Sequence, residues 1–289
     1  MSALVKAHLD HRRSWCDFDY CYPVISRRSK GVSLGVDLNP DKVCNFHCVY
    51  CEVDRTEAAR RKDVDLDQLE GEMAALLDLV ASGQLFANFP FSSAKPEHRR
   101  LNDIAFSGNG EPTTSKAFPA CVERLAALKR ARGLDGVKLV LITNATRLQD
   151  PEVVKAIDLL MASGGEIWAK LDAGTEEAYR TFNRSAVPFA RILENLAFAA
   201  GRWPLFIQTL FQEWQGRGPA EAELTAYIER IRELRGAGTL LGLQVYTVAR
   251  PTPETASRPL GSAAMDALAE RLRAELPDLP VEVFYGPVA

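Results

Sequence analysis

The chain has 289 residues, a formal net charge of −3, 47% hydrophobic residues and 25% charged residues. This composition is typical of a globular protein with a full core, and it excludes extensive disorder and a basic field over the whole chain. No stretch approaches the roughly 18 apolar residues of a membrane span, and the N-terminus lacks the apolar segment of a secretory leader. We therefore expect a cytoplasmic protein with no membrane partner, in which cysteines are metal ligands or catalytic groups rather than disulfides.

Short β-rich runs alternate along the chain with longer stretches of helical spacing, a pattern that predicts βα units around a parallel sheet. Strands are expected at residues 32–38, 103–107, 138–143, 166–171, 205–211, 241–248 and 281–286. Helices are expected at residues 66–80, 116–131, 151–162, 189–200, 220–235 and 263–276. Two segments fall outside the pattern, namely an N-terminal extension over residues 1–30 and an irregular excursion over residues 86–100.

Six βα units favour an α/β fold that is a partial (β/α)6 TIM-like barrel over the closed barrel of eight units. We expect a single core domain over residues 31–289, which ends in the C-terminal strand. In such folds functional groups gather at the carboxyl ends of the strands. The unusual polar segments SGNGEPT, TNATR, KLDAG and YTVARP each follow a predicted strand, and a cysteine segment follows the first one.

That cysteine segment, KVCNFHCVYCEVDR, covers residues 42–55 and is called the cysteine loop below. Cys44, Cys48 and Cys51 lie within eight positions of one another. Thiolates are the preferred ligands of zinc and of iron–sulfur clusters, and structural zinc requires four nitrogen or sulfur ligands. A [4Fe–4S] cluster held by only three cysteines leaves one iron open to an outside ligand, which favours chemistry. A zinc-stabilised binding module without catalysis stays an alternative.

The cysteine loop resembles the CxxxCxΦC signature of radical S-adenosylmethionine (SAM) enzymes, with Tyr50 as the aromatic residue. The resemblance implies that Cys44, Cys48 and Cys51 bind a [4Fe–4S] cluster whose open iron chelates the amino and carboxylate groups of SAM. An electron from the cluster then cleaves the sulfonium and gives a 5′-deoxyadenosyl radical. The resemblance also implies an external electron donor of the flavodoxin or ferredoxin type.

The segment FSGNGEPT resembles the glycine-rich GGE-type segment of the same family, with Asn109, Gly110 and Glu111 in the matching positions. In the family, backbone carbonyls of this segment bind the amino group of methionine. The resemblance implies a SAM site here, to which we also assign Ser107 and Gly108. The two glycines have a physical rationale of their own, because a backbone that closely approaches a ligand leaves no room for a Cβ.

Within the superfamily, the chain resembles most the iron–sulfur oxidoreductases related to the tRNA wyosine synthetases. Archaeal wyosine synthetases carry additional cysteines for a second cluster, whereas this chain offers Cys16 and Cys21 near its start and Cys121 in a predicted helix. We expect no second cluster. Cys121 is expected to be a small buried side chain.

Four polar residues at strand ends are candidates for contacts with SAM or substrate. Asn144 either holds SAM or is a turn asparagine. Lys170 and Asp172 flank one residue of an extended segment, so both side chains point to the same side and form a buried pair, with or without function. Lys170, as an amine of lowered pKa, could form a Schiff base. Arg250 is suited to a carboxylate or phosphate of the substrate.

The sequence thus predicts a radical SAM enzyme that removes a hydrogen atom from a substrate held within the barrel. A small molecule, a peptide and RNA stay open as substrates, and activation of a partner protein as a glycyl radical is a further alternative. The acidic net charge and the lack of an added RNA-binding module oppose the RNA alternative.

Overall fold

A computed structural model describes residues 15–286 of the chain, and these residues form two compact units. The first unit holds residues 15–44, Arg55–Ile142 and Asp150–Glu166. The second unit holds Asn45–Asp54, Thr143–Gln149 and residues 167–286. The unit boundary passes through the cysteine loop, so Cys44 belongs to the first unit and Cys48 and Cys51 belong to the second. The domain boundary predicted at residue 31 stays a prediction.

The first unit is built on strands β1 (Cys21–Ser26), β2 (Gly31–Val36), β3 (Leu101–Phe106) and most of β4 (Lys138–Thr143), hydrogen-bonded in that order. β1 runs antiparallel to β2, whereas β2, β3 and β4 are parallel. Leu34 pairs with Ile104, and Ile104 pairs with Leu139. All three side chains are fully buried. This row of aliphatic residues forms the centre of the first core.

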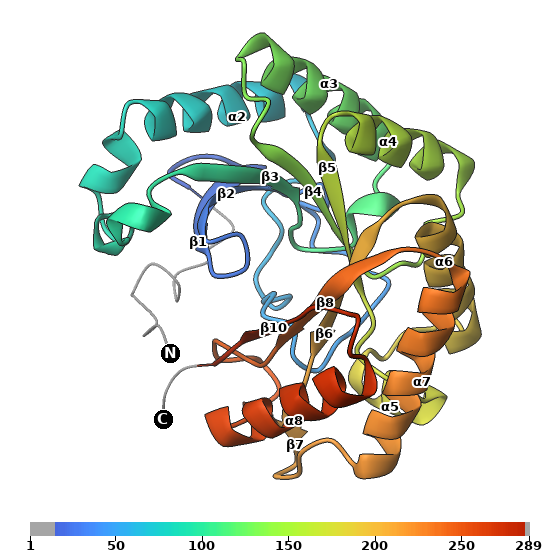
Figure 1. Cartoon of the computed structure of the whole chain (residues 1–289). Helices are drawn as coiled ribbons and strands as arrows, with labels where there is room; N and C mark the ends of the chain where they lie inside the picture. The colour runs from blue at the N-terminus through green and yellow to red at the C-terminus, as the bar shows by residue number, and fades with distance from the viewer. Residues whose placement is uncertain (1–14, 287–289) are drawn as a thin grey trace. The chain divides into compact units, whose positions relative to one another are not determined.

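Helices α2 (Leu66–Ala81), α3 (Phe118–Ala131) and α4 (Pro151–Ala162) follow β2, β3 and β4 and cover one side of these strands (Figure 1). The start of α2 is fixed by Asp65, whose side chain accepts hydrogen bonds from the backbone N–H groups of residues 67 and 68. Asp150 caps α4 in the same way, and Pro151 occupies its first turn. These local signals explain why the predicted bounds of α2 and α4 agree closely with the structure.

β1 lies within the segment that we predicted as an extension. Its sequence, CYPVIS, does not alternate between apolar and polar residues, which is the pattern that marks a half-buried strand. Its beginning is fixed by the buried carboxylate of Glu72 in α2. This group accepts hydrogen bonds from the backbone N–H groups of Asp19, Tyr20 and Cys21 at 3.0, 2.9 and 3.0 Å. The strand therefore depends on a contact that is distant in sequence.

The second unit is built on strands β5 (Gly165–Lys170), β6 (Leu205–Leu210), β8 (Leu240–Tyr246) and β10 (Val281–Phe284), which pair in parallel in that order. The first two residues of β5 belong to the first unit. Helices α6 (Phe189–Arg202), α7 (Glu221–Ala237) and α8 (Ser262–Glu275) connect these strands, and α6 and α7 lie side by side (Figure 1).

The two faces formed by strands β5, β6, β8 and β10 differ in chemistry. Thr209 of β6 bonds to the hydroxyl of Tyr227 in α7 at 2.6 Å, so this face meets the helices. By strand alternation, the register-paired row of Lys170, Gln208 and Gln244 lies on the other face. Nε2 of Gln208 donates to Oε1 of Gln244 at 2.7 Å. The polar residues of the second unit therefore share one face.

Several short elements were not predicted. They are α5 (Glu176–Phe182), the antiparallel pair β7 (Gln212–Trp214) and β9 (Ser257–Pro259), and the 3₁₀ helix η4 (Pro112–Thr114). Elements of three to seven residues are too short for a periodic signal. The predicted irregular segment contains the 3₁₀ helices η2 (Phe91–Ser93) and η3 (Pro96–His98) and the end of η1 (Gln84–Ala87).

In chain order, β2, β3, β4, β5, β6 and β8 are each followed by a helix, and β10 comes last. The predicted α/β class with six βα units is confirmed. Between residues 15 and 286, no helix combines the length and the apolar character that crossing a bilayer requires.

Candidate functional site

In the first unit, the buried carboxylate of Asp37 fastens the SGNGE segment (residues 107–111) to the chain that follows β2. Its Oδ1 accepts hydrogen bonds from the backbone N–H groups of Asn39 at 2.9 Å and Asn109 at 3.0 Å. Its Oδ2 accepts a bond from Nδ2 of Asn109. Asp37 is 1% exposed, so these bonds are shielded from water. One acidic side chain thus sets the position of the predicted SAM segment.

Gly108 and Gly110 are required by the packing of this segment. A Cβ on Gly110 would lie 2.2 Å from the carbonyl oxygen of Val43, the residue before Cys44. A Cβ on Gly108 would lie 2.3 Å from Oδ1 of Asp37. Gly110 therefore permits a close approach to the cysteine loop, and Gly108 permits one to Asp37. The approach to a ligand that we predicted stays a prediction.

The other predicted SAM residues of this segment also have partners within the first unit. Glu111 is 3% exposed and caps η4, where its Oε1 accepts bonds from the N–H and the hydroxyl of Thr113 at 3.1 and 2.6 Å. The carbonyl oxygen of Ser107 accepts a bond from the hydroxyl of Tyr22 at 3.1 Å. Their contact with SAM stays a prediction.

In the second unit, the end of α5 holds the backbone of the cysteine loop on both sides of Cys48. The N–H of His47 donates to the carbonyl of Asn183 at 3.0 Å, and the N–H of Val49 donates to the carbonyl of Phe182 at 2.9 Å. Val49 also packs in a buried apolar cluster together with Tyr50, Leu210 and Val248. The unpredicted helix α5 is therefore a main support of the loop.

The buried carboxylate of Asp172, just after β5, is the centre of the polar network in this unit. Its Oδ1 accepts a bond from the backbone N–H of Leu210 at 2.9 Å and faces Nζ of Lys170 at 3.1 Å. Its Oδ2 accepts bonds from the hydroxyl of Tyr50 and from Nδ2 of Asn183, the latter at 3.2 Å. Both oxygens are engaged, so Asp172 ties the cysteine loop to β5, β6 and α5.

Lys170 forms the predicted pair with Asp172, and the structure gives it a further partner. Its Nζ donates to the hydroxyl of Tyr246 at 2.5 Å and lies 5.1 and 4.9 Å from the ring centroids of Tyr50 and Tyr246. Burial alone would lower the pKa of Lys170, but Asp172 and Tyr246 raise it above its ordinary value. This shift has the opposite sign to the one that the Schiff-base hypothesis requires.

The three loop cysteines differ in environment from the other buried thiols. Cys44, Cys48 and Cys51 are half-buried, whereas Cys21 and Cys121 are fully buried, and all are free thiols. Burial, followed by the nearby Asp172 carboxylate, raises the pKa of the Cys48 thiol to about 12. Nδ2 of Asn183 lies 3.6 Å from its sulfur and donates to it. Such a donor fits a sulfur that carries negative charge as a metal ligand.

Within the part of the chain that the structure describes, no three His, Cys, Asp or Glu side chains form a group that could hold a single metal ion. An iron–sulfur cluster has a different requirement, because each thiolate binds a separate iron atom. Cys44, Cys48 and Cys51 have the spacing in the sequence that such a ligand set requires, and their binding of a cluster stays a prediction.

Asn144 holds the amino end of the loop through a closed ring of hydrogen bonds. Its Nδ2 donates to Oδ1 of Asn45, Nδ2 of Asn45 donates to Oγ1 of Thr146, and Oγ1 of Thr146 donates to Oδ1 of Asn144, each at 2.8 Å. Its Oδ1 also accepts a bond from the backbone N–H of Thr146 at 3.2 Å, as a turn asparagine would. Its contact with SAM stays a prediction.

Arg250 holds the carboxyl end of the loop. Its Nε donates to Oε2 of Glu52 at 2.7 Å, and a second guanidinium nitrogen contacts the same oxygen. The two side chains are 22% and 25% exposed. The guanidinium of Arg250, which we predicted to bind an anionic group of the substrate, is therefore already paired with the carboxylate of Glu52, the residue after Cys51.

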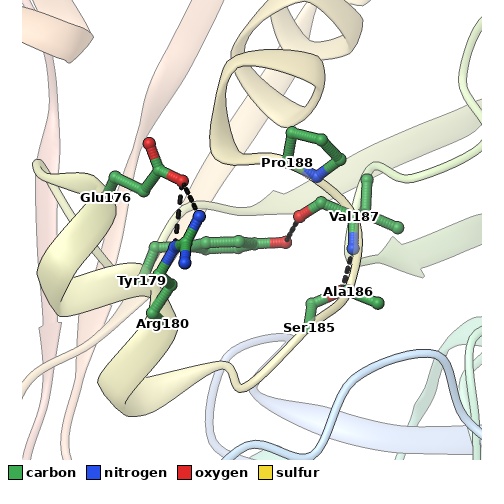
Figure 2. Close-up of a pocket in the computed structure, with 7 residues that line it drawn as sticks. All are labelled: Glu176, Tyr179, Arg180, Ser185, Ala186, Val187 and Pro188. Carbon is green, nitrogen blue, oxygen red and sulfur yellow. Dashed lines mark hydrogen bonds and ion pairs between the residues drawn. The ribbon is translucent and has the colours of Figure 1, made fainter.

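A small cavity of about 200 Å³ lies beside α5 (Figure 2). Its seven lining residues are Glu176, Tyr179, Arg180, Ser185, Ala186, Val187 and Pro188. The hydroxyl of Tyr179 donates a hydrogen bond to the carbonyl oxygen of Val187 at 3.0 Å. None of the predicted site residues lines it.

Sequence reasoning missed Asp37, Asn45 and Asn183. Asp37 had a usable signal, because it follows a buried strand directly and precedes Asn39-Pro40. Asn183 had none, because the partners of its side chain are 11 to 135 positions away in the sequence.

Parts of the chain are similar to several known proteins. No protein-family model matches it. A UPF0026 protein of Helicobacter pylori is 31% identical over 136 residues, which are 47% of this chain and 37% of that protein. A UPF0026 protein of Methanocaldococcus jannaschii is 27% identical over 167 residues, which are 56% of this chain and 43% of that protein. The matched segments span less than half of these relatives.

A third relative is named GTPase Obg, from Brachyspira hyodysenteriae. It is 25% identical over 162 residues, which are 56% of this chain and 20% of that protein. The present sequence contains no GxxxxGK[ST] segment, the phosphate-binding loop of many nucleotide-binding proteins.

Two solved structures resemble the chain over most of its length. TYW1 with a lysine–pyruvate adduct bound has a TM-score of 0.53 and 14% identity, and covers 85% of this chain and 74% of that one. anSMEcpe with bound AdoMet has a TM-score of 0.58 and 16% identity, and covers 87% of this chain and 63% of that one. Both are radical SAM enzymes. This likeness is one of fold, and it agrees with the resemblance that the sequence predicts. The order of strands and helices in each unit agrees with the predicted α/β fold of βα units.

Proposed function

We propose that this chain is a radical SAM enzyme in which Cys44, Cys48 and Cys51 bind a [4Fe–4S] cluster and the SGNGE segment binds SAM. The observation that carries the proposal is the cysteine loop, which presents three half-buried thiols at spacings of four and three. Buried polar groups fasten this loop along its length. The fold shared with AdoMet-bound anSMEcpe supports the proposal.

When bound, the cluster supplies an electron that cleaves SAM to a 5′-deoxyadenosyl radical, which removes a hydrogen atom from the substrate. The residues of this chain position the reacting groups. Asp37 holds the SGNGE segment against the amino end of the cysteine loop, and Asp172 holds the segment around Cys48. In this proposal the enzyme is cytoplasmic, and a flavodoxin or ferredoxin provides the electron.

The test is anaerobic reconstitution with iron and sulfide, followed by reduction and addition of SAM. Iron and sulfide content, the visible absorption of the cluster and the yield of 5′-deoxyadenosine are measured. Cys48→Ala should lose all three. Cys121→Ala is the matched control, because Cys121 is a fully buried thiol within α3, and it should retain them. Zinc in place of iron, or an unchanged 5′-deoxyadenosine yield in Cys48→Ala, would refute the proposal.

RNA modification is the second candidate at the level of substrate, and the likeness to TYW1, a wyosine synthetase, favours it. anSMEcpe, in contrast, was solved with a bound peptide. The reconstituted enzyme with SAM is therefore given bulk tRNA or a peptide fraction. A rise of 5′-deoxyadenosine with tRNA, together with salt-sensitive tRNA binding, supports RNA. A rise with peptides alone rejects it.

A further inference from the structure

We propose that Asn183 is a positioning residue for the cluster, because its amide aims an N–H donor at the sulfur of Cys48 and thereby sets the reduction potential. The inference rests on the proposed function, since it requires Cys48 as a cluster ligand. It assigns a task to a residue outside the cysteine loop and the SGNGE segment.

The surroundings of Asn183 fix the orientation of its amide. Asn183 is 2% exposed, and its Nδ2 lies 3.6 Å from Sγ of Cys48, 3.2 Å from Oδ2 of Asp172 and 3.3 Å from the hydroxyl of Tyr50. An ionised carboxylate can only accept hydrogen bonds, and the Tyr50 hydroxyl already donates to it. The amide must therefore present its nitrogen, not its oxygen, to this group of atoms.

The backbone of Asn183 performs a separate task. Its carbonyl accepts the bond from the N–H of His47, and its own N–H donates to the carbonyl of Tyr179 at 2.8 Å, where α5 ends. A change of the side chain removes the donor to sulfur and leaves these backbone bonds available. The effect on the cluster is thus separable from the support of the loop.

The physical effect has a definite sign. An N–H donor withdraws charge from a ligand sulfur and stabilises the reduced, more negative state of an iron–sulfur cluster, so it raises the reduction potential. Burial strengthens the effect, because no water competes for the sulfur. Loss of the donor should make the potential more negative, and a carboxylate in its place should make it more negative still.

The experiment compares Asn183→Ala, Asn183→Asp and Asn183→Gln with the wild type, all reconstituted with iron and sulfide. Asn195→Asp is the control, because Asn195 is also 2% exposed and its Nδ2 donates to the backbone carbonyls of Ala145 and Thr146 at 2.8 and 2.9 Å. The midpoint potential is measured by redox titration with the electron paramagnetic resonance signal of the reduced cluster as readout.

We expect a negative shift in Asn183→Ala, a larger one in Asn183→Asp, at least partial recovery in Asn183→Gln, and the wild-type potential in Asn195→Asp. Folded, cluster-loaded Ala and Asp variants with the wild-type potential would overturn the inference. If Asn183→Ala does not fold, equal potentials of the Gln and Asp variants overturn it, and a more negative Asp variant supports it. A wild type that takes up no iron and sulfide instead rejects the proposed function, and the inference falls with it.

Discussion

Nζ of Lys170 lies 3.1 Å from Oδ1 of Asp172, and the two side chains are only 16% and 2% exposed. Removal of one partner leaves the other charge buried without its counter-ion. Lys170→Met should therefore lower the free energy of unfolding by about 3 kcal/mol, as measured by denaturant titration. The double variant Lys170→Met/Asp172→Asn should lose less free energy of unfolding than the sum of the losses in the two single variants. Additive losses would show that the pair is not coupled.

The glycine requirement in the SGNGE segment can be tested separately. In Gly110→Ala the new methyl group would meet the carbonyl of Val43, so we expect a loss of about 3 kcal/mol of stability. Gly71→Ala is the control, because Gly71 lies inside α2 with nothing within 4 Å of the added Cβ. That change should stabilise the protein by about 1 kcal/mol. Equal melting temperatures for the two variants would reject the packing argument.

Arg250 has two possible tasks that kinetics can separate. If its only task is the ion pair with Glu52, Arg250→Gln and Glu52→Gln should each lower the free energy of unfolding by about 0.5 kcal/mol. The double variant should then lower it by no more than either single variant. If it binds a substrate anion, Arg250→Gln alone should raise KM. We expect the first result, because Nε of Arg250 already donates to Glu52.

Asp103 in β3 should make stability depend on pH. It is 2% exposed, its Oδ1 accepts a bond from the hydroxyl of Ser33, and its buried Oδ2 has no hydrogen-bond partner among residues 15–286. Burial raises its pKa above the ordinary value of 3.8. Because the pKa is raised in the folded state, protonation of Asp103 at low pH contributes to the free energy of unfolding. This contribution is lost as the pH rises through the pKa of the folded state.

Asp103→Asn should consequently be more stable than the wild type near neutral pH, and this advantage should shrink on acidification towards the ordinary carboxyl pKa. Melting temperatures of both proteins across this pH range provide the measurement. An advantage that is constant with pH would mean that Asp103 keeps its ordinary pKa when folded.

The sequence predicted those parts of the fold and site that depend on neighbouring residues. α4 has the predicted bounds because Asp150 and Pro151 mark its start locally. The cysteine loop was found from its spacing alone. Its supports were not found, because Arg250 and Glu52 are 198 positions apart and Tyr50 and Asp172 are 122 positions apart. No local pattern encodes such contacts, and β1 was missed for the same reason.

The contact of Glu72 with the start of β1 has a consequence for synthesis on the ribosome. The carboxylate that anchors Cys21 is made 51 positions after it. β1, which is an edge strand, therefore lacks this anchor until α2 has emerged from the ribosomal exit tunnel. Ribosome-bound nascent chains stalled before α2 emerges should be cut by protease near β1, whereas longer ones should resist. Protection at both lengths would show that the strand docks without its helix.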